Sequence, residues 1–341
     1  MKRWRETLAI LDRATRLAAA GERAAIATVV RITGSAYRRP GAKFLVEQGG
    51  NTAGGVSGGC LEADVRTVAL ELIAKGEGPR LLHYDTGKDD ETVWGLGLGC
   101  EGAVDIFVQP FGGEMAAGAG AQALSLLRGG TAFEQAAPFV IATAIKGPSA
   151  GMVEVRTRGL PGESSIEERG PDTLFIELLP PPPVLLIFGA GDDARPLAQL
   201  AAEAGFDVTL IDHRRGYLTP ERFPEPLRLV HRRASEGIPP LGRQHFAVVQ
   251  THSLQHDRDW LRALLAQPLS YVGLLGPGGR KEELLRQLGA QPSEKLFAPV
   301  GIDLGAEGPE QVAVSIVSEL LAVRAGRAPG HLRDRRGGIH E

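Results

Sequence analysis

The second half of this chain opens with Val184-Leu185-Leu186-Ile187-Phe188-Gly189-Ala190-Gly191-Asp192-Asp193-Ala194. Its apolar run predicts a buried strand, and the residues that follow have helical spacing as far as Ala204. Gly189 permits a tight turn, Gly191 permits close approach of a pyrophosphate, and Ala194 lets helix and strand pack closely. This pattern is the dinucleotide fingerprint of a Rossmann domain.

The residues after this turn continue the alternation of predicted strands and helices. A second predicted strand, 207–211, ends at Asp212, 21 residues after Gly191, where a carboxylate would bind a ribose hydroxyl. Further strands are predicted near 246–250 and 271–275, with a helix around 257–265 between them. We therefore expect an α/β protein whose C-terminal part is a Rossmann-like, doubly wound parallel sheet.

Polar residues follow the predicted strands, at the sheet edge where ligands bind in such folds. Asp192 and Asp193 complicate this picture, because carboxylates at a helix N-terminus repel a phosphate there. A structural turn without a ligand is therefore the alternative.

The spacing of His252, His256 and Asp257 could suit a metal, but hydrogen-bonding or capping roles are favoured. The candidate cofactor-binding residues of this half are Gly189, Gly191, Asp212, Thr251, His252 and Arg280.

The run Pro180-Pro181-Pro182-Pro183 is the sharpest break in composition and predicts a stiff connector. We expect an α+β domain over 1–179, a linker over 180–183 and the Rossmann-like domain over 184–341. The first domain is predicted to begin with an amphipathic helix within 1–21. Its other expected elements are a helix over 61–75 and strands at 24–32, 43–47, 80–84, 103–109, 139–145, 152–156 and 174–178.

Both cysteines of the chain close glycine-rich runs, Cys60 after 54–59 and Cys100 after 95–99. Glycines bring backbone N–H groups against a ligand, and a thiolate is a nucleophile or a soft metal ligand. Cys60 also precedes a predicted helix, whose dipole would stabilise its thiolate. Burial as small hydrophobic side chains and a mutual disulfide remain the alternatives. The candidate ligand-binding residues of these loops are Ser57, Gly58, Gly59, Cys60, Gly99 and Cys100.

Three cations, Arg38, Arg39 and Lys43, lie in the turn-rich segment 34–43. They are either solvated surface charges or a site that recognises an anionic group.

The whole-chain composition excludes some classes of function. With 43% hydrophobic and 23% charged residues and a formal net charge of -3, the chain is typical of a globular protein without the basic excess of nucleic-acid binders. We find no uninterrupted apolar run long enough for a membrane span or a signal peptide, so a cytoplasmic location is expected.

Taken together, these segments resemble the XdhC/CoxI family, the accessory factors for maturation of xanthine dehydrogenase and related molybdenum hydroxylases. The resemblance runs over nearly the whole chain. One departure is Gly276-Pro277-Gly278-Gly279-Arg280, where the family often has Gly-Ser-Arg. The segments that carry the resemblance are 34–41, 56–62, 97–100, 186–191, 217–223, 251–253 and 298–306.

The resemblance implies a chaperone that binds molybdenum cofactor, as molybdopterin or its dinucleotide form. Such a chaperone protects the cofactor while a cysteine desulfurase installs its terminal sulfur, and it then hands the cofactor to an apo-hydroxylase of the xanthine dehydrogenase type. It has no turnover of its own and no catalytic residue. We hypothesise that Cys60 and Cys100 contact the molybdenum centre.

Two other functions are kept open. One is an NAD(P)-dependent oxidoreductase with His252 as acid/base, and the other is a scaffold with a vestigial nucleotide site. A homodimer is plausible, although no sequence pattern points to one.

Overall fold

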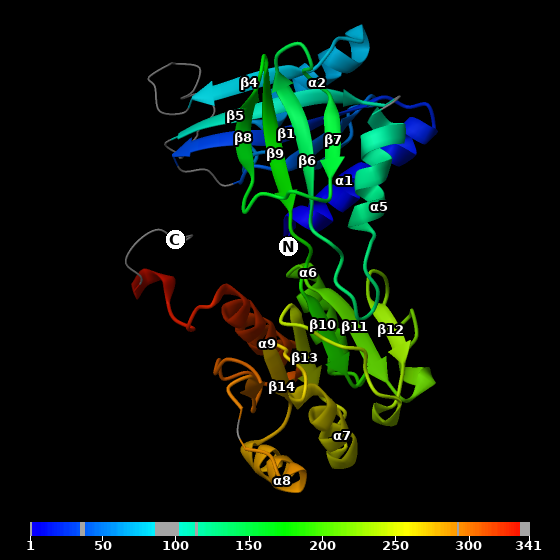
Figure 1. Ribbon diagram of the computed structural model, residues 1–341, viewed down its shortest axis with the longest axis vertical. Helices are drawn as coiled ribbons and strands as arrows, with labels where there is room; N and C mark the ends of the chain where they lie inside the picture. Colours follow the sequence, from blue (N-terminus) through cyan, green and yellow to red (C-terminus); the bar gives the residue numbers. More distant parts are fainter. Residues whose placement is uncertain (1, 35–37, 86–101, 113–114, 292, 335–341) are drawn as a thin grey trace. The chain divides into compact units, whose positions relative to one another are not determined.

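The structure is a computed structural model that describes residues 2–34, 38–85, 102–112, 115–291 and 293–334 (Figure 1). It forms two compact units, unit 1 with residues 1–129 and 136–181 and unit 2 with residues 130–135 and 182–341. The chain passes from unit 1 to unit 2 for the last time within the proline run. The short segment 130–135 also belongs to unit 2. In this segment, Ala132 O accepts a hydrogen bond from Thr209 Oγ1 at 2.9 Å, and Phe133 O accepts one from His245 Nε2 at 2.8 Å.

Unit 1 contains an antiparallel sheet in the order β3-β2-β1-β5-β4. Alternation along β1 explains why both faces of this sheet are covered. Ala25, Ala27 and Val29 pack against α2 (Glu62–Lys75), whereas Ile26 packs in the cluster that includes α1 residues. The strands are β1 (Ala24–Gly34), β2 (Lys43–Glu47), β3 (Thr52–Gly54), β4 (Arg80–Asp85) and β5 (Gly102–Phe111).

A second antiparallel sheet of unit 1 has the order β7-β6-β9-β8. Val30 and Phe107 from the first sheet pack with Ile145 and Phe175 from the second, so the two sheets share a core. The remaining elements are α1 (Lys2–Ala19), η1 (Ala116–Gly120), α5 (Ala121–Leu127), β6 (Phe139–Lys146), β7 (Val153–Arg156), β8 (Ser165–Arg169) and β9 (Asp172–Leu179). The polar strand β8 was not predicted, because its mostly charged sequence lacks an apolar alternation.

Unit 2 is built on a parallel sheet in the order β12-β11-β10-β13-β14-β15. The predicted fold class is thereby confirmed. The chain leaves β10 to one side for β11 and returns to its other side for β13, which makes the β10–β13 edge the topological switch point. The strands are β10 (Val184–Phe188), β11 (Asp207–Asp212), β12 (Arg228–His231), β13 (His245–Val249), β14 (Tyr271–Leu274) and β15 (Leu296–Phe297).

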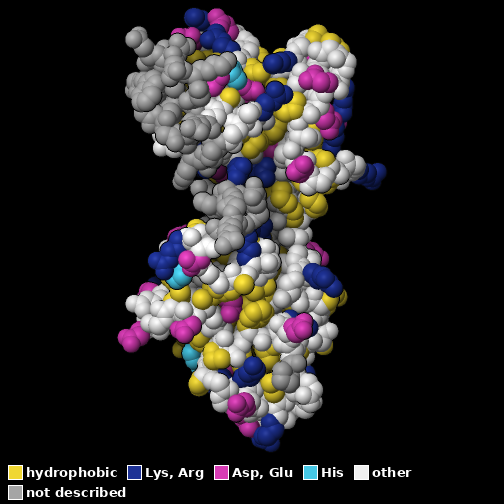
Figure 2. Space-filling view, turned by 90° about the vertical axis from the view of Figure 1, so that its left-hand side faces the viewer, with side chains coloured by type: hydrophobic (Ala, Val, Ile, Leu, Met, Phe, Trp, Pro, Cys, Tyr) yellow, Lys and Arg dark blue, Asp and Glu magenta, His cyan; other side chains and the backbone are white. Residues whose placement is uncertain are grey.

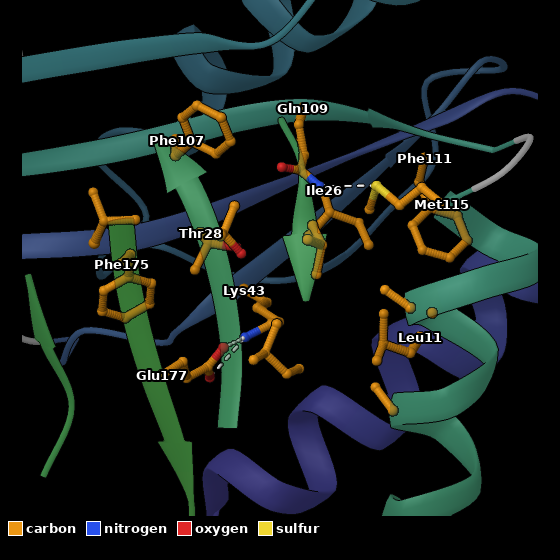
Figure 3. A pocket seen from close by; sticks show the side chains of 17 residues that line it. Leu11, Ile26, Thr28, Lys43, Phe107, Gln109, Phe111, Met115, Phe175 and Glu177 are labelled. Carbon is orange, nitrogen blue, oxygen red and sulfur yellow. Dashed lines mark hydrogen bonds and ion pairs between the residues drawn. The ribbon is translucent and has the colours of Figure 1, made fainter. Parts of the chain in front are cut away.

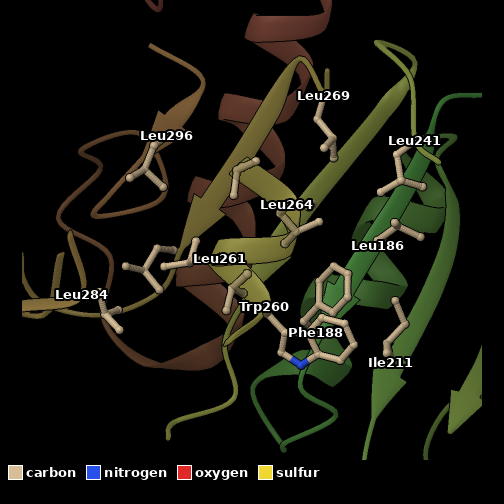
Figure 4. Packing of buried hydrophobic residues seen from close by; sticks show 14 of the residues in the cluster. Leu186, Phe188, Ile211, Leu241, Trp260, Leu261, Leu264, Leu269, Leu284 and Leu296 are labelled. Atoms are coloured by element: carbon tan, nitrogen blue, oxygen red, sulfur yellow. The ribbon is translucent and has the colours of Figure 1, made fainter. Parts of the chain in front are cut away.

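The helices of unit 2 bury the apolar sheet residues. Phe188 contacts Trp260 of α7 with ring centroids 4.5 Å apart, and Leu284 of α8 joins the same cluster (Figure 4). The helices are α6 (Ala194–Glu203), α7 (Leu254–Leu265), α8 (Gly278–Leu288) and α9 (Gly308–Ala325), and short 3₁₀ turns lie at Arg215–Tyr217, Ala234–Glu236 and Leu332–Asp334.

Charged side chains of both signs are interspersed on the face that Figure 2 displays. This mixture agrees with the small net charge of the chain. None of the helices in the described ranges is long and apolar enough to cross a membrane.

Candidate functional site

The Rossmann turn is built as its glycines predict. Gly189 follows β10 with φ of +112°, a conformation that side chains rarely adopt, and a Cβ there would lie 2.4 Å from Gln250 O. The turn therefore packs directly on the end of β13. Ala190 donates its N–H to Asp212 Oδ2 at 2.8 Å, so the turn is also tied to the end of β11.

Asp212 is buried, and its hydrogen bonds come from within the protein. Besides the Ala190 N–H, its carboxylate accepts the Arg214 backbone N–H at 2.8 Å and the Arg214 side chain at 3.0 Å through Nε and 2.8 Å through Nη2. A carboxylate has about four lone-pair positions, and these four bonds use them. Asp212 in this arrangement holds the turn and Arg214, and a ribose hydroxyl would have to displace one of these donors.

Burial of Asp212 raises the pKa of its carboxyl, but the hydrogen bonds from Arg214 and Ala190 outweigh burial and hold this pKa below its usual value. The stabilisation is complete above the unfolded-state pKa, near 3.9, and is lost as the pH falls through the lower folded-state pKa. We expect Asp212→Asn to lower the free energy of unfolding at pH 7 by about 1–3 kcal/mol, because a neutral amide cannot accept all these bonds.

This loss is measured by urea unfolding at several pH values, and it should shrink below about pH 4. The matched control is Asp192→Asn, since Asp192 is exposed and its ion pair with Arg222 contributes less than about 1 kcal/mol. Equal losses for both variants at pH 7 would contradict the role given to Asp212.

The two carboxylates of the turn, which follow Gly191, also have partners. Asp193 Oδ2 accepts from His252 Nε2 at 2.8 Å, and Asp192 Oδ1 accepts from Arg222 Nη2 at 2.9 Å. His252 is exposed and has φ of 60°, the one non-glycine residue with positive φ among those described. Asp193 therefore joins the turn to His252, at the sheet edge where the sequence predicts both.

Thr251 and Arg280 are held by one buried carboxylate, Asp257 on α7. Asp257 Oδ1 accepts the Thr251 N–H at 3.1 Å, and Oδ2 accepts from Arg280 Nε at 2.9 Å. Gly278-Gly279-Arg280, the end of the segment that departs from the family pattern, forms the first turn of α8. Arg280, in the first turn of α8, therefore joins α8 to α7 through its ion pair with Asp257, which neutralises the guanidinium charge.

An aromatic and cationic cluster that was not predicted from the sequence lies beside Asp212. The Arg214 guanidinium carbon lies 3.8 Å from the centroid of the Tyr217 ring, and that of Arg222 lies 5.0 Å from it. The rings of His213 and His256 have centroids 4.3 Å apart, and burial together with the neighbouring charge of His256 lowers the pKa of His213. The cations that immediately follow Asp212 were the available signal.

In unit 1, the glycine loop that ends at Cys60 is organised by Glu62, the first residue of α2. Glu62 Oε1 accepts the N–H groups of Val56 at 3.0 Å and Ser57 at 2.8 Å, and Oε2 accepts the Ser57 hydroxyl. Burial raises the pKa of Glu62, but these hydrogen bonds have the larger combined effect and hold the pKa below its usual value. Ser57 Oγ in turn accepts the Leu61 N–H at 3.1 Å.

Cys60 is partly exposed beside this network, two residues before α2 begins at Glu62. Its Sγ lies 3.6 Å from Ser57 Oγ. Gly58 and Gly59 are exposed, and Gly59 has φ of +117°. The loop therefore presents a thiol and two glycines at its surface. Gly99 and Cys100, the corresponding candidates of the second glycine loop, lie outside the described residues.

The three cations of segment 34–43 have different environments. Arg38 pairs with Glu6 of α1, and its Nε donates to Gly55 O at 3.0 Å, so it braces the glycine loop. Lys43 is the first residue of β2, only 5% exposed, and its Nζ lies 2.6 Å from Glu177 Oε2. Arg39 is exposed, and within the described part of the chain it has no ion-pair partner. Arg39 alone of the three is placed to meet an anion from solvent.

The His252, His256 and Asp257 set is not gathered around a common point that could hold a metal ion, since His252 binds Asp193 and Asp257 binds Thr251 and Arg280. More generally, no group of three or more His, Cys, Asp or Glu side chains within the described ranges is placed to hold one.

Comparison with known proteins covers both units. The XdhC Rossmann domain matches residues 185–320, and the XdhC and CoxI family domain matches residues 17–85. A Bacillus subtilis (strain 168) protein, named as a probable subunit of xanthine dehydrogenase, is 33% identical over 323 residues, which are 89% of this chain and 94% of that protein.

A second relative, the Escherichia coli (strain K12) protein named "Molybdenum cofactor insertion chaperone PaoD", is 26% identical over 310 residues, 89% of this chain and 84% of its own length. A crystal structure described as a xanthine dehydrogenase from Bacillus halodurans is 25% identical and has a TM-score of 0.74, covering 93% of this chain and 96% of that one. The resemblance drawn from the sequence motifs is confirmed, and the chain belongs to the XdhC and CoxI family.

Proposed function

We propose that this protein binds molybdenum cofactor and delivers it to a molybdenum hydroxylase of the xanthine dehydrogenase type. The observation that carries the proposal is similarity across both units to a protein named as a molybdenum cofactor insertion chaperone, with 89% of this chain and 84% of that protein aligned. Similarity to a probable subunit of xanthine dehydrogenase points to the same class of partner.

The glycine loop of unit 1 suits this cargo. The molybdenum centre of the cofactor is soft and rich in sulfur, and a thiolate is a ligand of matching softness. Cys60 Sγ is accessible, while Glu62 and Ser57 hold the surrounding backbone, so the thiol can bind without rebuilding the loop.

Several contacts support a shared site for Cys60 and Cys100. Tyr84 OH, near the end of β4, donates to Asp64 Oδ2 in the first turn of α2 at 2.5 Å. Gly102, two residues after Cys100 in the sequence, begins β5 and pairs with Gly34 at the end of β1. The residues that flank the second glycine loop therefore lie at the end of the sheet where Cys60 precedes α2. We propose that both cysteines contact the molybdenum centre and that Arg39 meets the phosphate of the cofactor.

The finer steps of the proposed function follow from the chemistry of the cargo. The chain would shield the cofactor while a cysteine desulfurase supplies the terminal sulfur, and it would release the cofactor into the apo-hydroxylase, acting as a monomer or a homodimer. An NAD(P)-dependent oxidoreductase is not favoured by unit 2, because the lone pairs of Asp212 are already used and two carboxylates, Asp192 and Asp193, flank the turn.

The proposal is tested by mixing the purified protein with isolated molybdenum cofactor and separating bound from free cofactor by gel filtration. We expect Cys60→Ala and Cys100→Ala each to lower retention about tenfold or more, because each removes a proposed contact to the metal. Thr67→Ala, on the exposed face of α2, is the control and should retain cofactor like the wild type. Equal retention by all the proteins would remove the cysteines from the site, and no retention by the wild type would refute the proposed function.

A further inference from the structure

Unit 1 contains a cavity between its two sheets (Figure 3). Its volume is about 50 Å³, whereas one water needs roughly 10–15 Å³ on the same measure. The walls are mostly apolar, with Phe107, Phe111 and Phe175 among the lining side chains. No residue of the Cys60 loop lines it. The cavity is therefore separate from the proposed cofactor site.

Among the described residues that line this cavity, one polar atom lacks a hydrogen-bond partner. Gln109 on β5 is 7% exposed, and its Nε2 donates to Met115 Sδ at 3.0 Å, while its Oε1 is buried without a hydrogen bond. Figure 3 shows the amide turned toward the space between the sheets, with the Thr28 hydroxyl also facing the pocket. Burying a carbonyl oxygen without a hydrogen bond costs free energy. A molecule in the cavity that donated to Gln109 Oε1 would remove this cost.

The charged groups at the opposite side of the cavity are already balanced. Lys43 Nζ donates to Glu177 Oε1 at 2.8 Å, to Glu177 Oε2 at 2.6 Å and to Gly41 O at 3.2 Å. These three bonds use every hydrogen of the ammonium group. An occupant with a net charge would find no counter-charge to spare, and burying it unpaired would be costly.

We propose that this cavity binds a small uncharged molecule with the size of a single ring, whose N–H or O–H group donates to Gln109 Oε1. The aromatic and aliphatic walls bury its apolar body, and Gln109 selects for the donor. This site is independent of molybdenum cofactor binding, and its test does not involve the cofactor.

Phenol is a suitable probe, because it joins one ring to one O–H donor, and toluene has nearly the same shape without the donor. We expect calorimetric titration of the full chain to show saturable phenol binding with a Kd of about 1 mM, as is usual for so small a ligand. Absence of saturable binding of phenol would mean that the cavity holds water only, and it would overturn the proposal.

Two variants and one control variant locate the binding. Val153→Phe fills the cavity from β7 and should abolish phenol binding, whereas Glu154→Phe, at the exposed neighbouring position on the opposite face of β7, should leave it intact. Gln109→Met removes the acceptor and should reduce the ratio of phenol to toluene affinity by about 3- to 10-fold. Thermal unfolding of each variant checks that it is folded. Unchanged phenol binding in folded Val153→Phe, or an unchanged ratio in folded Gln109→Met, would overturn the assignment.

Discussion

Gly189→Ala is expected to destabilise unit 2 by about 3–5 kcal/mol, which is among the largest effects of a single added methyl group. The Cβ would lie 2.4 Å from Gln250 O and 2.8 Å from the Gln250 carbonyl carbon. Both atoms belong to backbone that continues directly from β13, so they cannot move away as a side-chain end could. The φ of +112° adds backbone strain for any residue with a Cβ.

Gly191→Ala is the matched control for Gly189→Ala. Its Cβ would lie 2.6 Å from Asp193 Oδ1, the end of a side chain that can rotate away. The cost is then mainly the partly exposed Asp193–His252 pair, less than about 1 kcal/mol. Scanning calorimetry of the full chain should show the unfolding transition of unit 2 lowered only by Gly189→Ala. Similar transitions for both variants would contradict the close packing of the turn on β13.

Lys43→Met is expected to lower the free energy of unfolding of unit 1 by about 3–5 kcal/mol at pH 7. The substitution leaves Glu177, which is 2% exposed, as a buried carboxylate without its counter-charge. Methionine has nearly the length and shape of the lysine chain, so little packing is lost. The double variant Lys43→Met/Glu177→Met removes both charges and should recover at least half of the loss, because desolvated ion pairs gain little over apolar groups of similar size.

Urea unfolding followed by circular dichroism measures these changes. Arg156→Met is the control for Lys43→Met, since Arg156 pairs with the exposed Glu154 at 2.8 Å and the loss should stay below about 1 kcal/mol. If Lys43→Met and the double variant were equally unstable, the buried charge left on Glu177 would not be the cause.

The Rossmann-like half of the chain could be predicted from its sequence because its signals are local. The apolar run 184–188, the turn glycines and the strand that ends at Asp212 lie within 29 residues of sequence, and each signal depends on near neighbours. The same holds for the α2 helix behind Cys60. The start of α8 at Gly278 was not predicted from the sequence, because glycine has a low intrinsic helix propensity, which packing overrides here.

The partners of the charged residues could not be predicted. Lys43 and Glu177 are 134 residues apart, and they meet only because the two antiparallel sheets pack together. A hint was present, since Lys43 directly precedes the apolar run of β2 and Glu177 lies inside the apolar run of β9. Arg38 likewise finds Glu6 on α1, 32 residues earlier in the chain. The sequence of segment 34–43 therefore predicts a basic loop, whereas in the structure Glu6 and Glu177 neutralise two of its three cations.

The family, the doubly wound sheet of unit 2 and the glycine loop that ends at Cys60 could be inferred from the residues alone, since they depend on periodicity and on short motifs. Which polar groups remain available to a ligand depends instead on how the folded chain packs. The Asp212 carboxylate binds Ala190 and Arg214, and Lys43 is neutralised by Glu177. Gln109 Oε1 has no partner among the described residues and lies in a cavity between two sheets. The physical reason is that hydrogen bonds and ion pairs are satisfied by whichever groups packing brings within about 3 Å, however far apart they are in sequence.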